Sequence, residues 1–154
     1  MIVGSAQLGA NLGLASVMVA ITVLMHFWGL LLLTRAVSGG GARLKPHETH
    51  GGAALVILIG VFGVFGLHTA EIWSYAALYR ALGETASFEQ ALYFSTTTFS
   101  SLGLGDVVLS PRWRMLSAIE AANGVILFAW STAFLLTLTR QIKFLEHDWF
   151  EKRS

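Results

Sequence analysis

The stretch that decides the fold lies at residues 88–106 and has the sequence FEQALYFSTTTFSSLGLGD. Its first part, Phe88–Phe99, is apolar and rich in hydroxyl groups. It is too short to cross a bilayer, which takes about 20 apolar residues. Ser87, followed by Gln90 three positions later, fits the capping-box pattern that begins a helix. The sequence therefore predicts a short helix over residues 87–99.

The second part of the stretch is Ser101-Leu102-Gly103-Leu104-Gly105-Asp106, which we call the glycine segment. Its alternate glycines break a helix and free the backbone. Backbone that is not helical is tolerated at membrane depth only inside protein or around water. A short helix followed by an extended, glycine-relieved strand is the pattern of a re-entrant pore loop. The alternative is a tight extracellular turn.

Long apolar stretches flank this region on both sides. Hydrophobic residues make up 55% of the 154 residues and charged residues 12%, with a mean hydropathy of +0.65. A soluble domain carries about 25% charge. Residence in a membrane is therefore predicted, with spans at Leu8–Thr34, from Gly51 to about Leu78, and at Leu116–Thr139. Arg35–His50, with its glycine triplet and basic residues, is expected to be a polar connection.

The placement of charge predicts how the chain lies in the membrane. No Lys or Arg precedes Arg35, so the first span lacks the basic region of a cleaved signal and is expected to be retained. In a three-span chain, the first connection and the tail lie on one side and hold most of the basic residues. The positive-inside rule then predicts a cytoplasmic C-terminus and a pore loop that enters from outside. Cysteine is absent, and no basic run indicates nucleic-acid binding.

Ala91-Leu92-Tyr93-Phe94-Ser95 and the run from Ser100 through the glycine segment resemble the pore helix and selectivity filter of potassium channels. The family filter has the sequence Thr-Val-Gly-Tyr-Gly-Asp. Arg114 matches the start of the family's inner helix, and Gly124 stands where the family has its gating-hinge glycine. The resemblance covers Gly51–Thr139 and is of the bacterial ion-channel type, with the first span added outside it.

The resemblance implies an all-α membrane protein that assembles as a homotetramer. Each chain would contribute three transmembrane helices, a re-entrant pore helix and a selectivity filter. The expected location is the cell membrane, specifically a bacterial inner membrane. The expected parts are an N-terminal helix with its cytoplasmic connection (1–50), a pore module (51–139) and a cytoplasmic tail (140–154). Within the module we expect an outer helix (51–79), the pore helix (87–99), the filter (101–106) and the inner helix (114–139).

In the resemblance, K+ is held by the carbonyl groups of Ser101, Leu102, Gly103 and Leu104, and Gly105 and Asp106 complete the filter. An ion that leaves water needs replacement oxygens at each step. The two glycines allow the φ values that keep successive carbonyls pointing inward. Ser and Leu replace the Thr and Tyr of the family filter, so the phenol that braces the family's filter is missing. No cofactor is expected besides the permeant K+.

Spacing on the third span places Ala121, Val125, Phe128 and Thr132 on one face of a helix. The resemblance turns this face toward a water-filled cavity; the alternative is that it packs against neighbouring helices. Two acids within the spans also need an account, because ionisable groups there are costly. We hypothesise that they support the filter through the pore-helix threonines; alternatively, they form purely structural pairs. The candidate filter supports are Glu71, Glu120 and Thr97.

The function that the resemblance implies is passive conduction of K+ by a channel subunit. Two alternatives stay open: a weakly selective or non-selective monovalent cation channel, and a non-conducting membrane subunit of a larger complex. An enzyme is not expected, because no Ser/His/Asp or two-His metal arrangement is evident. The expected partners are further copies of the chain, membrane lipid and monovalent cations, and no nucleic acid.

Overall fold

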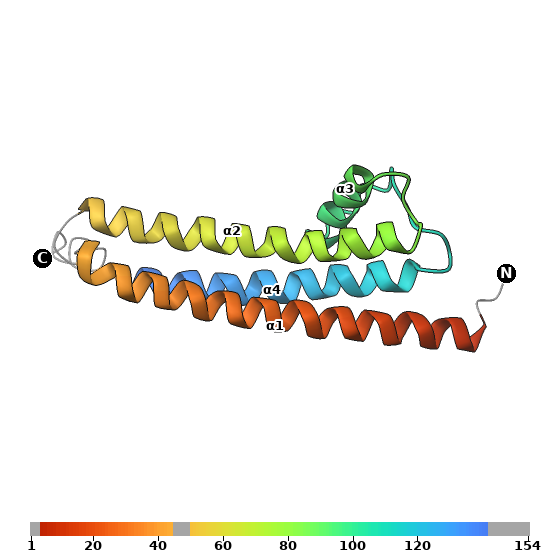
Figure 1. The fold of residues 1–154 in the computed structure, drawn as a ribbon, viewed down its shortest axis with the longest axis horizontal. Helices are drawn as coiled ribbons and strands as arrows, with labels where there is room; N and C mark the ends of the chain where they lie inside the picture. The colour runs from red at the N-terminus through yellow and green to blue at the C-terminus, as the bar shows by residue number, and fades with distance from the viewer. Residues whose placement is uncertain (1–3, 45–49, 142–154) are drawn as a thin grey trace, which may run out of the picture. The chain divides into compact units, whose positions relative to one another are not determined.

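The structure, a computed structural model, describes residues 4–44 and 50–141. Within these residues it is all-helical, with four helices (Figure 1). They are α1 (Ser5–Leu44), α2 (His50–Ala81), α3 (Phe88–Phe99) and α4 (Arg114–Gln141). Three of them are long and apolar enough to cross a membrane, over Ser5–Gly39, Gly51–Ala81 and Arg114–Arg140. The three predicted spans are therefore confirmed, whereas most of the predicted tail (142–154) lies outside the described residues.

The first helix corrects one expectation. We predicted a polar connection from Arg35, but α1 continues as a helix to Leu44, through the glycine triplet at 39–41. Each glycine costs a helix only about 1 kcal/mol relative to alanine, and extending an existing helix is far easier than starting one. Pro46, which would prevent further helical bonding, comes only after this end.

The chain divides into two compact units. Among the described residues, the first unit contains those up to His26 together with His68–Phe128, and the second contains those of Phe27–Leu67 and those from Ala129 to Gln141. In the first unit, an aromatic core joins α2, α3 and α4, and the rings of Tyr79 and Phe94 meet edge to face at 5.2 Å. This core holds α3 in place and so determines where the glycine segment begins.

The start of α3 is fixed by its cap. Ser87 is the N-cap, and its hydroxyl oxygen accepts a hydrogen bond from the backbone N–H of Gln90 at 3.1 Å. The Gln90 side chain accepts in return from the N–H of Ala86 at 2.9 Å, one residue earlier than in a standard capping box. The short helix thus begins where the sequence pattern indicates, with a shifted return bond.

Side chains of α1 anchor the turn that leads into α4. The side-chain amides of Asn11 and Gln7 both donate to the backbone carbonyl of Arg112, at 2.6 and 3.2 Å. On the same turn, the Glu84 carboxylate accepts from the N–H and the hydroxyl of Ser110, at 2.7 and 2.9 Å. The part of α1 up to His26 is therefore an integral part of the first unit.

In the second unit, glycines allow the helices to approach closely. A Cβ atom added at Gly63 would collide with the side chain of Leu33, and one added at Gly60 with the side chain of Leu138. Small residues that let helices approach in this way are common in membrane proteins. A Cβ at Gly66 would meet no atom within 4 Å, so Gly66 has no such role in the described structure.

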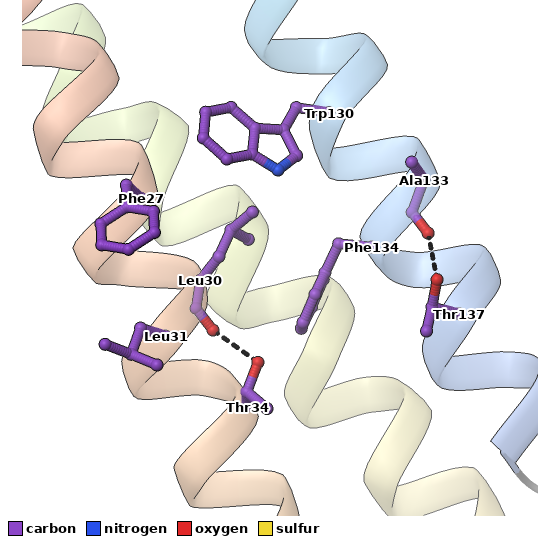
Figure 2. A pocket seen from close by; sticks show the side chains of 8 residues that line it. All are labelled: Phe27, Leu30, Leu31, Thr34, Trp130, Ala133, Phe134 and Thr137. Atoms are coloured by element: carbon purple, nitrogen blue, oxygen red, sulfur yellow. Dashed lines mark hydrogen bonds between the residues drawn. The ribbon is translucent and has the colours of Figure 1, made fainter.

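An apolar groove lies between α1 and α4 in the second unit (Figure 2). Its volume is about 360 Å³. The two threonines in its lining turn their hydroxyls onto their own helices: Thr34 donates to the Leu30 carbonyl at 2.8 Å and Thr137 to the Ala133 carbonyl at 2.9 Å. The groove therefore presents methyl groups and rings, including Phe27, and suits hydrocarbon better than ions.

Candidate functional site

The glycine segment directly follows α3, and its first N–H groups donate hydrogen bonds to carbonyl groups of that helix. The N–H of Ser101 donates to the Thr98 carbonyl at 2.8 Å. The N–H groups of Leu102 and Gly103 both donate to the Thr97 carbonyl, at 2.9 and 3.1 Å. Among the described residues, no hydrogen bond ends on the carbonyl oxygens of residues 101–105. The N–H groups of residues 101–103 thus bond to α3, whereas the carbonyl groups of the segment can accept from another partner.

The backbone of the segment alternates in the sign of φ. Positive values occur at Ser101 (59°), Gly103 (52°) and Gly105 (78°), but not at the leucines between them. In an ordinary strand successive carbonyls alternate between two sides, and φ values of alternating sign instead favour one side. Glycine adopts these φ values freely, whereas for a non-glycine residue the conformation costs roughly 1–2 kcal/mol of free energy. The strained position of Ser101 was not predicted from the sequence.

A brace from α3 holds the acid at the end of the segment. The Tyr93 hydroxyl donates to the Asp106 carboxylate at 2.8 Å, and the same carboxylate accepts from the N–H of Val107 at 3.0 Å. This bond raises the pKa of Tyr93 above its usual value of 10.0, because the phenol proton is shared with an anion. Sequence analysis missed this pair, although Tyr93 lies within the matching pore-helix motif.

The rest of the segment is open on the single chain. Leu102 and Leu104 are 66% and 62% exposed. A cavity of about 350 Å³ lies along the segment, between the last turns of α3 and the first turns of α4. Ala121, one of the predicted pore-lining residues, is part of its wall. The apolar side chains of the segment therefore have room for a neighbouring surface.

The predicted pore-lining face of α4 is mostly uncovered. Val125 is 54% exposed, Thr132 is also exposed, and Ala121 is half-buried. Phe128 is 37% exposed, and its ring lies 4.6 Å from the His68 ring and 5.5 Å from the Phe99 ring, measured between centroids. The face is thus open as the prediction requires, but Phe128 also packs within the first unit.

Gly124 lies where α4 meets the end of α3. A Cβ atom added there would collide with the carbonyl oxygen of Phe99 and lie 2.9 Å from its carbonyl carbon. Only glycine lets the two backbones approach this closely. This contact gives Gly124 a packing role; its predicted role as a gating hinge stays a prediction.

Glu120 is fully buried beneath α3. Its carboxyl oxygens receive the Tyr79 hydroxyl at 2.5 Å and the Ser95 hydroxyl at 2.6 Å. We predicted a pore-helix threonine as donor; that was wrong, because the residue facing Glu120 is Ser95. The Thr97 hydroxyl instead donates to the Phe94 carbonyl at 2.9 Å. Thr97 supports the segment through its main-chain carbonyl.

Glu71 does not reach α3 through any hydrogen bond that the described residues show. One carboxylate oxygen lies 2.8 Å from Nδ1 of His26, and the other lies 2.8 Å from Nδ1 of His68. The predicted bond to a pore-helix hydroxyl is therefore absent at this acid. His68 lies one turn before Glu71 on α2, whereas His26, the single ionisable side chain in the first predicted span, reaches Glu71 from α1. The three side chains offer ligand atoms that lie within 4.8 Å of one another.

These features define a class of protein: a helical membrane protein with a short helix that leads into a backbone loop of unpaired carbonyls. Comparison with protein families makes this specific, because residues 67–141 match the family described as ion channel. The resemblance to a potassium-channel-superfamily pore module is thereby confirmed for the second half of α2, α3, the glycine segment and α4. Neither curated proteins nor solved structures give a significant match. The protein thus contains an ion-channel domain and is a multi-pass membrane protein.

Proposed function

We propose that this chain is the pore-forming subunit of a homotetrameric potassium channel that conducts K+ passively through Ser101–Asp106. The observation that carries the proposal is the backbone of the glycine segment, with its N–H groups bonded to α3, its carbonyls unpaired and φ alternating in sign. An unpaired carbonyl buried in an assembly is costly unless a cation or water satisfies it. Rings of such carbonyls replace the hydration shell of a permeant ion.

The electrostatics of α3 favour a cation near the segment. As a re-entrant pore helix, α3 would direct its C-terminus, at Phe99, toward the conduction path. The C-terminal end of a helix carries a partial negative charge that stabilises cations. Asp106, held by Tyr93, adds a negative charge at the other end of the segment. The ion would thus meet negative potential on both sides of the carbonyl rings.

The surfaces that one chain leaves exposed support a tetramer. The exposed leucines of the glycine segment and the exposed face of α4 need a partner, and one chain has too few helices to enclose an ion path. Cyclic symmetry supplies the missing wall from identical copies. We propose four copies around the segment, with Ala121, Val125, Phe128 and Thr132 facing the cavity and the C-terminus in the cytoplasm.

Flux through liposomes tests the proposal. The purified chain should pass K+, and Gly103→Ala should abolish the flux, because alanine disfavours the φ of 52° found there. Gly66→Ala is the matched control: its added methyl group meets no atom within 4 Å, and it should conduct normally. A normal flux in Gly103→Ala, or a conducting monomer or dimer, would overturn the proposal.

One observation favours the weakly selective alternative. Leu104 cannot donate the hydrogen bond that the family's tyrosine makes, and the segment is braced at Asp106 instead. Reversal potentials in opposed K+ and Na+ gradients separate the two functions. A potential near the K+ equilibrium value supports the selective channel. A value near zero, restored toward K+ by Leu104→Tyr, supports the weakly selective one.

A further inference from the structure

Three ligand-bearing side chains, none of them in the glycine segment, converge in the first unit. His26 comes from α1, and His68 and Glu71 lie one turn apart on α2. Both imidazoles direct Nδ1 at the same carboxylate, one at each oxygen, at 2.8 Å. The carboxylate therefore lies between two rings whose centroids are 5.4 Å apart. Side chains from two different helices thus direct possible metal-ligand atoms toward one point.

The cluster is buried, which demands an explanation. His26 and Glu71 are fully buried and His68 is 6% exposed, all on helices long and apolar enough to span a membrane. Ionisable groups in such places are costly and mark functional sites by default. A bound cation would compensate the charge of the carboxylate and use all three ligands at once.

The donor set and its spacing suit one class of cation. Two imidazole nitrogens and one carboxylate oxygen make up a ligand set of open zinc sites. Donors about 2.0–2.2 Å from a tetrahedral metal lie roughly 3.3–3.5 Å apart. The two nitrogen–oxygen distances of 2.8 Å, one to each carboxylate oxygen, are shorter than this, and the three ligand atoms lie within 4.8 Å of one another, so side-chain rotations would have to bring them to metal-binding distances. We propose that His26, His68 and Glu71 bind one divalent transition-metal ion of the zinc class.

One of the three side chains also contacts α3 and α4. His68 is the only one of the three that is not fully buried, and its ring contacts Phe99 at the end of α3 and Phe128 on α4. A metal bound there ties α1 to α2 and fixes the His68 ring against both phenylalanines. Any effect on conduction rests on the proposed function, whereas metal binding does not, and the test below measures binding alone.

The test uses the full chain, purified in detergent and stripped of metal with a chelator. Titration with Co2+, a spectroscopic substitute for zinc, should produce the visible absorption bands of a four-coordinate site, saturate at one ion per chain and be reversed by Zn2+. His26→Gln and Glu71→Gln should each weaken binding by at least about tenfold. Glu120→Gln changes the other buried acid, outside the cluster, and should bind as the parent does.

Each outcome decides the proposal. Saturable bands in the parent and in Glu120→Gln, lost in the two cluster variants, support it. A parent chain that gives no bands overturns it and leaves the cluster as a hydrogen-bonded pairing that can hold a proton. Unchanged binding in a folded Glu71→Gln chain also overturns it. Should both cluster variants fail to fold, a folded His68→Gln chain that binds as tightly as the parent overturns it, and one that loses the bands supports it.

Discussion

The two units of the chain are built from the same long helices but differ in what they bury. Among the described residues, the buried polar side chains lie almost entirely in the first unit: Asn11, Thr22, His26, His68, Glu71, Thr85, Ser95, Thr97, Glu120 and Asn123. The second unit buries Ser131, and otherwise packs leucine, valine and alanine against glycine. One half is therefore specified by hydrogen bonds and the other by close contact of small residues.

This difference matters because lipid is as apolar as leucine. Within a membrane, helices gain little from burying hydrocarbon, so apolar contacts resist small rotations or slides only weakly. Buried polar groups must find their partners and so fix the rotation of each helix. The first unit holds the glycine segment, whose geometry depends on the exact rotation of α2, α3 and α4, and it contains the network that such a rotation requires.

The largest expected effect comes from adding a methyl group at Gly124. Its Cβ would meet backbone atoms of Phe99, so α3 or α4 must move. We expect a loss of about 3 kcal/mol in the free energy of unfolding, at the upper end for overpacking, together with loss of the proposed K+ flux. Denaturant titration of the purified chain, followed by circular dichroism, measures the change.

The matched control lies in the second unit. Gly63→Ala also creates a collision, but with the tip of the Leu33 side chain, which can change rotamer. It should cost less than about 1 kcal/mol. Equal losses in the two variants would show that the second unit is as rigid as the first.

The next effect tests the network around Glu120. Glu120→Leu strips the hydrogen-bond partner from the buried Tyr79 hydroxyl and should cost about 1–3 kcal/mol. Glu120→Gln should retain most of the stability. Its amide oxygen can accept from Tyr79 and its N–H can donate to Ser95, whose own proton would then go to the Ile72 carbonyl, 3.0 Å away. The same unfolding titration distinguishes them. A glutamine variant as unstable as the leucine variant would show that the carboxyl group itself is needed.

A smaller effect is expected at Thr22. Its hydroxyl donates to the Met18 carbonyl at 3.0 Å and accepts from the Asn123 side chain at 2.8 Å, which links α1 to α4. Thr22→Val should cost about 0.5–1.5 kcal/mol. Thr34→Val in the second unit removes a hydroxyl bonded only to its own helix and should change stability by a few tenths at most. Similar losses in both would contradict the contrast between the units.

The smallest effect concerns Tyr93, which is exposed. Because Asp106 raises the pKa of its phenol, the bond between them is fully present below about pH 10, the usual tyrosine pKa, and is lost only as the pH rises above the raised value. Tyrosinate absorbance in alkaline solution, taken as the difference between the parent and Tyr93→Phe, isolates this residue. Asp106→Asn should bring its midpoint back toward 10.0. An unchanged midpoint would show that the brace is not formed in solution.

Much of the fold follows from local sequence, whereas most partners in the site do not. Span lengths and the cap at Ser87 predict helices, and the spacing of Gly103 and Gly105 predicts an irregular backbone. By contrast, α2 is apolar on all sides, so periodicity does not choose the face that turns inward. The pairing of Glu71 with His26 and the choice of Ser95 over Thr97 depend on such rotations. They become visible only once the helices are packed.

The shared carbonyl of Thr97 has a mechanical consequence. The N–H groups of Leu102 and Gly103, which are consecutive residues of the glycine segment, both donate hydrogen bonds to this single oxygen. A rotation of one peptide plane, between Thr97 and Thr98, would release two N–H groups together and loosen two consecutive residues of the proposed ion path at once. Because the two hydrogen bonds share one acceptor, they would break together in a single step and not one after the other. Single-channel records of the parent should therefore show abrupt closures from full conductance rather than graded intermediate levels.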